Sequence, residues 1–393
     1  MLSFFTTTLS LIAALAPAVL GAPNIALRDV KTFVGKVKPK GYIVTLKECA
    51  SKDELLENLG SSVTAVFNRT SKGFAGVLDD NDLNSIRNNP GKLYYSIAQD
   101  GIVSVTTTQY LAPSSIDRTN APWGLARISQ RAALGSSDTS ALTYRYNYDP
   151  SGGAGVDIYV VDTGIYTAHS TFGGRASWGA TFGGYVNADG NGHGTHVTGT
   201  VGGTQYGVVN SVHLIAVKVL DDSGSGYISD ILAGLERVID AVEASGKPSI
   251  VSLSLGGSAS TTFDNGIMAV INAGIHVVVA AGNDNTNASG TSPAHVAATI
   301  TVGASTITDA RASSSNYGSV VDIFAPGQYI TSSWIGGTSM ATPHVSGLVA
   351  YLIGVNGNQS PAAISALIRS LGITGVLSNI SSGTVNLLAN NGY

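Results

Sequence analysis

The second half of the chain contains strand-length runs that are apolar nearly throughout, without alternation of polar and apolar residues. A strand buried on one face alternates, whereas a strand of a parallel sheet, buried on both faces, does not. The runs are 156–162, 213–220, 275–281 and 298–304. Helical patterns separate several of them, at 228–245, 265–274 and 341–354. This order predicts an α/β fold in which a parallel sheet is flanked by helices on both faces.

The N-terminal part of the chain has a different pattern. From residue 41 to about residue 105, strand-like and short helical segments follow in the order β-α-β-β-α-β. That order fits a small ferredoxin-like α+β unit. The polar stretch "TTTQYLAPSSIDRTNAPWGL" comes next and is typical of an exposed linker that proteases reach. We therefore expect two folded units joined by a cleavable segment.

Residues 1–21 are typical of a secretory signal, because an apolar run through Leu20 ends in small residues. The alternative is a membrane anchor, but the uninterrupted apolar part is shorter than the roughly 20 residues that a span needs. We expect a secreted, extracellular protein with no membrane segment after processing. Four glycosylation triplets agree with export; they begin at Asn68, Asn287, Asn358 and Asn379.

Composition narrows the possible partners. The formal net charge is −4, which indicates neither nucleic-acid binding nor a polybasic membrane patch. Hydrophobic residues make up 44% of the chain and charged residues 12%, enough to build a large core. Cys49 is the only cysteine, so no internal disulfide is possible and the core must stabilise the protein, with or without a metal ion.

Polar residues follow several of the buried strand runs. Asp162 ends the first run, Ser254 and Gly256 lie at the end of "SLSLGG", and Asn283 follows "VVVAAG". Active sites of parallel sheets gather at the carboxyl ends of the strands. We therefore expect these side chains to converge on one site.

Each candidate catalytic residue also has a structural interpretation. Asp162 caps a turn or orients a histidine, and Asn283 stabilises a turn or donates to an oxyanion. His193 and His196 share a helical face and so could ligate zinc, but "HGTH" lacks the glutamate base of such enzymes. Ser339 caps the helix that follows it, or serves as a nucleophile if a histidine activates it.

In combination these motifs resemble one family. "VVDTGI", "NGHGTHVTGT", "SLSLGG", "AAGN" and "GTSMATPHVSG" are similar to those of the subtilisin-like serine proteases (subtilases), within them to the proteinase K-like branch of secreted fungal enzymes. The chain order of acid, base and serine is that of subtilisin. The resemblance implies that Asp162, His193 and Ser339 form the triad of a serine endopeptidase and that Asn283 supplies the oxyanion donor.

The resemblance also implies how the chain is divided. Residues 1–21 would be the signal peptide, 22–115 an inhibitor-type propeptide folded over about 41–105, and 116–393 a monomeric peptidase domain. The propeptide would act as an intramolecular inhibitor until it is cut off between Pro113 and Arg118, and Cys49 would leave with it.

Substrate is expected to bind as an added β-strand between "SLSLGG" and "DDSGSGY". The expected substrate-binding residues are Ser254, Leu255, Gly256, Gly224, Ser225 and Gly226. The residues expected to frame the specificity pocket carry no charge, which predicts protein or peptide substrates with apolar or aromatic side chains before the cut. Fungal members of the family include keratin- and cuticle-degrading enzymes linked to host invasion.

Calcium is the cofactor that the resemblance implies. Asp322 would supply a carboxylate, and the backbone carbonyls of Ala297 and Thr299 would supply further hard oxygen ligands. The alternative is that Asp322 is an ordinary aspartate of a surface turn.

One segment departs from the family. Relatives place about seven more residues between the tryptophan corresponding to Trp334 and the catalytic "GTS", where a hairpin delivers the serine. The sequence "SSWIGGTSMATPH" is too short for that hairpin. The alternative function is therefore a catalytically impaired secreted subtilase homologue that acts by binding.

Overall fold

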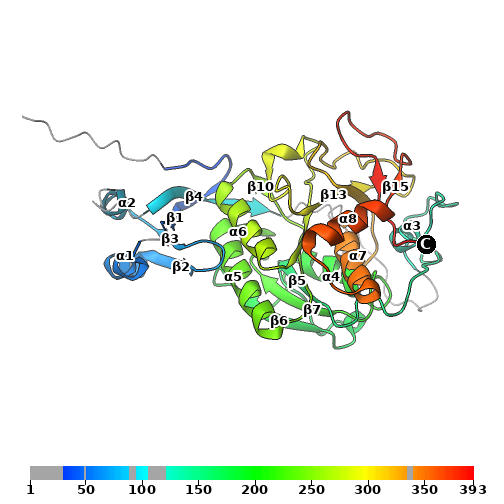
Figure 1. The fold of residues 1–393 in the computed structure, drawn as a ribbon, viewed down its shortest axis with the longest axis horizontal. Helices are drawn as coiled ribbons and strands as arrows, with labels where there is room; N and C mark the ends of the chain where they lie inside the picture. The colour runs from blue at the N-terminus through cyan, green and yellow to red at the C-terminus, as the bar shows by residue number, and fades with distance from the viewer. Residues whose placement is uncertain (1–29, 48–49, 88–93, 105–120, 334–339) are drawn as a thin grey trace, which may run out of the picture.

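The computed structural model describes residues 30–47, 50–87, 94–104, 121–333 and 340–393. Several features predicted above lie outside these residues, namely the signal 1–21, Cys49, the cleavage region from Pro113 to Arg118, and the segment 334–339 with Ser339. Figure 1 shows a small N-terminal unit, coloured blue, at one end of a larger domain coloured from green to red.

The larger domain is built on a single twisted sheet. Its strands are β5 (Asp157–Asp162), β6 (Ala176–Thr181), β7 (His213–Lys218), β9 (Ser249–Leu253), β11 (His276–Ala280), β13 (Ile300–Ser305), β14 (Ile323–Pro326), β15 (Ile373–Thr374) and β16 (Leu387–Leu388). In the part of the chain that the structure describes, they follow the order β15-β16-β14-β13-β11-β9-β5-β7-β6. Neighbours are parallel except for β15 and β16, which are antiparallel.

Helices cover both faces of this sheet. They are α3 (Trp123–Arg127), α4 (His193–Gly202), α5 (Ile228–Ser245), α6 (Thr261–Asn272), α7 (Ala341–Asn356) and α8 (Pro361–Leu371). Ile158 and Val160 of β5 pack into the core formed with α4 and α7, whereas Tyr159 and Val161 pack into the core formed with α5 and α6. The prediction of a parallel sheet buried on both faces is confirmed.

The N-terminal unit has the predicted order of elements. They are β1 (Val37–Leu46), α1 (Lys52–Leu59), β2 (Val63–Phe67), β3 (Gly73–Val77), α2 (Asp80–Arg87) and β4 (Tyr94–Ser104). The strands pair antiparallel in the order β2-β3-β1-β4, which is the ferredoxin-like arrangement. This part of the fold prediction is also confirmed.

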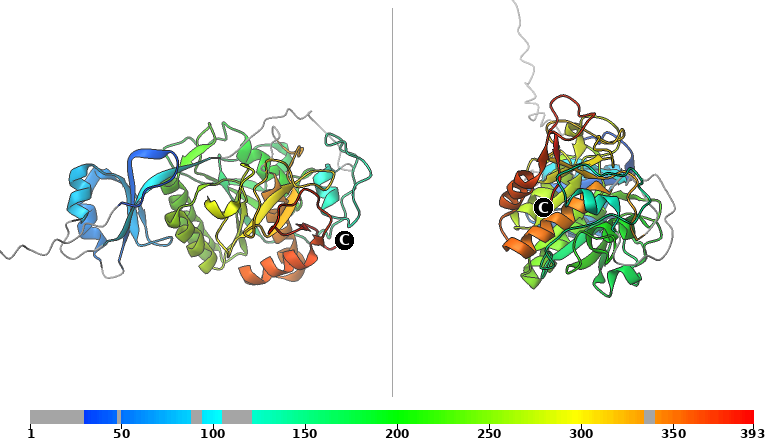
Figure 2. Two further views of the ribbon diagram at one scale, coloured as in Figure 1. Left: turned by 90° about the horizontal axis from the view of Figure 1, so that it is seen from above. Right: turned by 90° about the vertical axis from the view of Figure 1, so that its right-hand side faces the viewer.

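Both faces of the N-terminal sheet are buried. Val44 and Phe74 pack with side chains of α1 and α2, while their neighbours Ile43 and Ala75 pack with α5 and α6 of the larger domain. Figure 1 and the left view of Figure 2 show the blue sheet lying against these two green helices. The N-terminal unit thus docks by burying one sheet face on the larger domain.

The end of β4 continues into the larger domain. Ile102 pairs with Tyr227 and Ser104 with Ser225 in an antiparallel ladder with β8 (Ser225–Tyr227). On its other side β4 meets β10 (Gly257–Ser258): a Cβ built on Gly257 would lie 2.9 Å from Val103 Cγ1. The strand therefore lies between "DDSGSGY" and "SLSLGG", the place where the sequence predicts a substrate strand.

Carboxylates tie the two units together. Glu236 of α5 accepts hydrogen bonds from the backbone N–H groups of Asn68, Arg69 and Thr70 at 2.8, 2.6 and 2.7 Å. Asp100 of β4 accepts from Ser229 N at 3.0 Å, at the start of α5, where the helix dipole favours negative charge.

A second carboxylate lies close to Asp100 at the start of α5. Burial raises the pKa of Asp230 to about 6, with Lys38 opposing this rise and the charge of Asp100 adding to it. Because its pKa is raised, the carboxyl of Asp230 is least costly to bury when protonated, and its burial becomes unfavourable as the pH rises through about 6.

None of the helices within the described residues combines the length and the apolar character that crossing a membrane requires.

Candidate active site

Asp162 and His193 meet at the carboxyl edge of the sheet. Asp162 is the last residue of β5, and His193 is the first residue of α4, which packs against that strand. His193 Nδ1 lies 2.8 Å from Asp162 Oδ1 and 2.9 Å from Oδ2, and both side chains are 1% exposed. The carboxylate accepts from Thr163 N at 2.7 Å as well, so its position is fixed by backbone and imidazole together.

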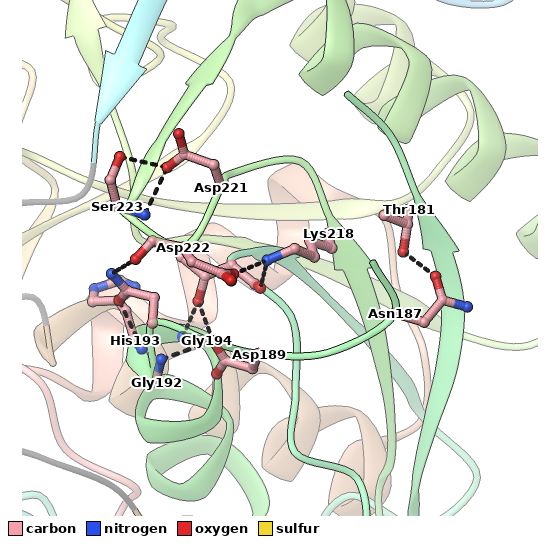
Figure 3. A network of polar contacts seen from close by, with 12 residues as sticks. Thr181, Asn187, Asp189, Gly192, His193, Gly194, Lys218, Asp221, Asp222 and Ser223 are labelled. Carbon is pink, nitrogen blue, oxygen red and sulfur yellow. Dashed lines mark hydrogen bonds and ion pairs between the residues drawn. The ribbon is translucent and has the colours of Figure 1, made fainter. Parts of the chain in front are cut away.

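Asp189 holds the start of α4 in place. One of its oxygens accepts from Gly192 N at 2.8 Å, and the other accepts from Thr195 N at 2.8 Å. It also accepts from Thr163 Oγ1 at 2.9 Å, which joins the helix start to the turn after Asp162. Figure 3 shows Asp189, Gly192 and His193 at this junction. The sequence analysis missed Asp189, although an aspartate shortly before a helix is a capping signal.

Lys218 supports the same turn from the neighbouring strand β7. Its side chain is 1% exposed, and its Nζ donates to Thr163 O at 2.7 Å and to Asp222 Oδ1 at 2.9 Å (Figure 3). A buried ammonium is tolerated only when it is paired in this way. The sequence pattern does not mark Lys218, which stands within an otherwise apolar strand.

The second ring nitrogen of His193 is available for chemistry. Nε2 is buried and makes no hydrogen bond to any of the described residues. Since Nδ1 is held by Asp162, a proton on Nδ1 leaves Nε2 as the acceptor. Helix α7, which begins at Ala341 just after Ser339, packs against α4. Ser339 itself lies outside the described residues, so its contact with His193 stays a prediction.

A pocket of about 360 Å³ lies at the carboxyl ends of β9 and β11. The lining includes Ser254, Leu255, Gly256, Ala280 and Asn283. The substrate-binding residues predicted from "SLSLGG" and the predicted oxyanion donor Asn283 therefore line one cavity. Asp284, which the sequence analysis did not consider, brings a carboxylate to the same lining.

The N-terminal unit also reaches this pocket. Phe33, Gly35 and Ile102 line it from the side of the N-terminal unit. Phe33 N donates to Gln99 Oε1 at 3.0 Å, which ties the segment before β1 to β4. The pocket is thus shared between the two units.

Gly224, Ser225 and Gly226 lie apart from the lining of this pocket, at the start of β8. Asp221 shapes their turn by accepting from Ser223 N at 2.8 Å and Ser225 N at 3.0 Å, and Figure 3 shows Asp221 with Ser223. Ser225 and Gly226 pair with Ser104 and Val103 of β4, so the chain's own strand occupies this edge.

The predicted calcium ligands lie at the opposite edge of the sheet. Ala297 and Thr299 precede β13, and Asp322 precedes the neighbouring strand β14. Asp322 Oδ2 accepts from Thr301 N at 2.9 Å, and Oδ1 lies 2.8 Å from Arg369 Nη1. The donors are hard oxygens that suit calcium, but a guanidinium already pairs with the carboxylate. Among the described residues no group of three His, Cys, Asp or Glu side chains could hold a metal ion.

The four predicted glycosylation residues are all exposed. Asn287 Oδ1 accepts from Ser289 N at 3.0 Å, and Asn358 Oδ1 lies 3.0 Å from His276 Nε2. In each of these two residues the contact uses the amide oxygen, whereas a glycan is attached through the amide nitrogen. Asn379 differs, because its amide nitrogen donates to Arg311 O at 3.4 Å.

The fold and the aspartate–histidine pair at the carboxyl edge of the sheet define the class of subtilisin-like serine proteases. The chain belongs to the subtilase family, because the family model described as "Subtilase family" matches residues 153–375.

Individual relatives resemble the chain over nearly its whole length. It is 44% identical to the subtilisin-like serine protease AsES of Sarocladium strictum, with 98% of each chain covered. It is 40% identical to a cuticle-degrading protease of Metarhizium anisopliae, covering 98% of this chain and 99% of the relative. A cold-adapted subtilisin-like serine proteinase of known structure superimposes with a TM-score of 0.63 at 42% identity, covering 69% of this chain and 98% of the other.

Proposed function

We propose that this protein is a secreted serine endopeptidase, made as a zymogen, in which Asp162, His193 and Ser339 form the catalytic triad. The buried pair of Asp162 and His193 carries this proposal, because it presents Nε2 as a base while Nδ1 is held. Ser339 Oγ attacks the scissile carbonyl and its proton passes to His193 Nε2. Asp162 keeps the proton on Nδ1 and stabilises the imidazolium that forms.

The oxyanion is received by the side chain of Asn283 and the backbone N–H of Ser339. His193 then gives its proton to the leaving amine, and the acyl-enzyme is released by water after a second proton transfer. Asn283 supports this role by lining the pocket into which the substrate carbonyl would enter.

Labelling with a serine-directed fluorophosphonate tests the proposal. We expect one adduct on Ser339 of the processed wild-type chain, located by intact mass and peptide mapping, with loss of activity in parallel. The His193→Ala and Ser339→Ala variants should take up none. Folded wild-type chain that stays unlabelled would instead favour the alternative, a secreted homologue that binds without turnover. The reason for considering this alternative is the segment between Trp334 and Ser339, which is shorter than in relatives.

We expect a preference for apolar or aromatic side chains before the cut, since Leu255, Gly256 and Ala280 offer no charge to the pocket. In a panel of peptides that vary only at this position, kcat/KM for Phe and Leu should exceed that for Lys by at least ~10-fold. Asp284 is the charged residue that the lining adds, so Asp284→Asn should lower cleavage after Lys and leave cleavage after Phe unchanged. Faster cleavage after Lys than after Phe by the wild-type enzyme would contradict the proposal.

The N-terminal unit acts as the propeptide, with the boundaries 22–115 and cleavage between Pro113 and Arg118. Its support is that the end of β4 lies in the expected substrate position beside β8 and that Phe33 lines the pocket. A substrate cannot pair with β8 while β4 does, because each strand edge offers one set of hydrogen bonds. The signal 1–21 and the four glycosylation triplets support secretion.

Calcium binding at Asp322, with the carbonyls of Ala297 and Thr299, belongs to the same proposal as a structural site. We expect Ca²⁺ to bind only by displacing the guanidinium of Arg369 from Asp322 Oδ1. Arg369→Gln should therefore tighten Ca²⁺ binding, measured as a larger rise of Tm when Ca²⁺ is added to chelator-treated enzyme. Arg145→Gln serves as a control, because Arg145 lines a separate pocket near the start of the domain. An equal rise in wild type and Arg369→Gln would show that the two cations do not compete.

The relative from Metarhizium anisopliae is named for degrading cuticle. By that likeness we propose structural proteins such as cuticle or keratin as substrates, with a contribution to host invasion. Digestion of insoluble cuticle and keratin, compared with casein at equal activity on a small peptide, tests this assignment.

A further inference from the structure

Asn316 is a fully buried residue whose side chain makes its hydrogen bonds with the loop that carries Asn283. It lies in the connection between β13 and β14 and is 0% exposed. Its Oδ1 accepts from Asp284 N at 3.0 Å and from Thr286 N at 3.0 Å. Its Nδ2 donates to Ala281 O at 2.9 Å, and its own backbone N donates to Gly282 O at 2.9 Å. These bonds hold the loop on both sides of Asn283.

The fit around Gly282 explains why the side chain controls the loop. Gly282 has φ +107°, a conformation that other residues rarely adopt, and a Cβ built there would lie 2.3 Å from Asn316 Nδ2. The amide therefore packs directly on the glycine backbone, one residue before Asn283. No helix or strand includes residues 281–286, so hydrogen bonds to the β13–β14 connection hold this loop. Asn285 N donates to Ser314 O at 2.8 Å and Tyr317 N donates to Thr286 O at 3.0 Å, whereas the bonds of Asn316 are those that reach the residues on either side of Asn283.

The pattern of donors and acceptors requires an amide. An asparagine side chain accepts from two N–H groups on one end and donates to a carbonyl on the other. Aspartate has the same shape but would place a carboxylate oxygen against Ala281 O, where the amide nitrogen now donates. Asn316→Asp therefore keeps the volume and two of the bonds and replaces the third with a repulsion between two acceptors.

We propose that Asn316 is a positioning residue for the oxyanion donor, holding the side chain of Asn283 at the place where negative charge develops. The inference rests on the proposed role of Asn283. An oxyanion donor acts through geometry, and a displacement of ~1 Å can cost ~10²-fold in rate. Substitution of Asn316 would thus lower kcat although its side chain does not contact the substrate.

The test compares Asn316→Asp and Asn316→Ala with wild type on one peptide substrate, well below the Tm of each variant. We expect kcat to fall by ~10- to ~100-fold with KM nearly unchanged, and affinity for a peptide aldehyde to fall by a similar factor. Asn386→Ala is the matched control, because Asn386 makes the same kind of clamp on Leu377, at 3.0 and 2.7 Å. It should lose stability and keep kcat. Where a variant yields no mature enzyme, the rate of propeptide cleavage within the zymogen gives the same comparison.

Asn283→Ala separates this inference from the proposed function. If Asn283→Ala leaves kcat unchanged, the oxyanion role itself fails. If Asn283→Ala is slow and the Asn316 variants are as fast as Asn386→Ala, only the role of Asn316 fails. If both act through one group, adding Asn316→Ala to Asn283→Ala should cost little further rate, whereas independent effects would multiply.

Discussion

Replacing Asp162 by Asn is expected to yield a folded zymogen that processes itself ~10⁴-fold more slowly, the loss measured for this substitution in another serine-protease triad. Asp162 is fully buried and accepts from His193 Nδ1 and Thr163 N. An asparagine can still accept from Thr163 N through its oxygen, so the strand end keeps its shape. Its amide then faces Nδ1 as a donor, which moves the imidazole proton to Nε2 and removes the base.

The measurement is the rate of propeptide release, followed by intact mass, together with kcat on a peptide for any mature enzyme. Asp157→Asn is the matched control, because Asp157 is the first residue of the same strand and pairs with Lys247 at 3.2 Å. This control should process at the wild-type rate. Equal rates of propeptide release for Asp162→Asn and Asp157→Asn would show that Asp162 has no catalytic role.

The second large effect concerns stability, and it comes from the buried ion pair of Arg127 and Asp309. The Arg127 side chain is 0% exposed and donates to both carboxylate oxygens, at 2.7 and 3.0 Å. Its third contact is Gln130 O at 2.8 Å. The pair joins α3, at the start of the larger domain, to the turn after β13.

Asp309→Asn should destabilise the mature enzyme by ~3–5 kcal/mol, because it leaves a buried charge without its partner. For a domain of this size that corresponds to a fall in Tm of roughly 6 to 20 °C. Asparagine is chosen because Asp309 has φ +56°, which asparagine tolerates well. Calorimetry at a fixed scan rate, on enzyme blocked with a fluorophosphonate, measures the change without autolysis.

Two further variants give this prediction its controls. Arg127→Met combined with Asp309→Asn should recover part of the lost Tm, since no unpaired charge remains. Lys247→Met breaks an ion pair whose lysine is 51% exposed and whose carboxylate, on Asp157, also lies 3.6 Å from His213 Nδ1, so it should destabilise the enzyme by less than Asp309→Asn does. A double variant less stable than Asp309→Asn would show that the charge is not the cause.

Local sequence pattern was sufficient for much of the fold. The nearly uninterrupted apolar run ending at Asp162 marks a strand buried on both faces, and its end marks the edge of the sheet where Asp162 meets His193. His193 follows a glycine-rich turn at a helix start, and its nearness to Asp162 is implied by the resemblance to the subtilases rather than by the strand pattern. The observed contact between the two side chains agrees with that expectation.

The residues that the sequence analysis missed act through partners distant in the chain. Lys218 looks like an interruption of a strand until Thr163 O, 55 residues earlier in the chain, is seen beside its ammonium. Arg369 is an ordinary helix residue until it meets Asp322. Asn316 stands in a polar loop that no periodic pattern describes, and its importance appears only in its contacts with Ala281 and Asp284.

The sequence by itself determined which segments become strands and helices, because the period of apolar residues reflects local backbone geometry. It also determined which chemical groups stand at strand ends. Only the tertiary structure decided that β4 occupies the place beside β8, that Asp189 ties two loops together, and that buried charges find their counterparts. Those outcomes depend on distances between segments far apart in the chain. Burial makes each pairing necessary, because a polar group withdrawn from water costs free energy unless it is hydrogen-bonded to another.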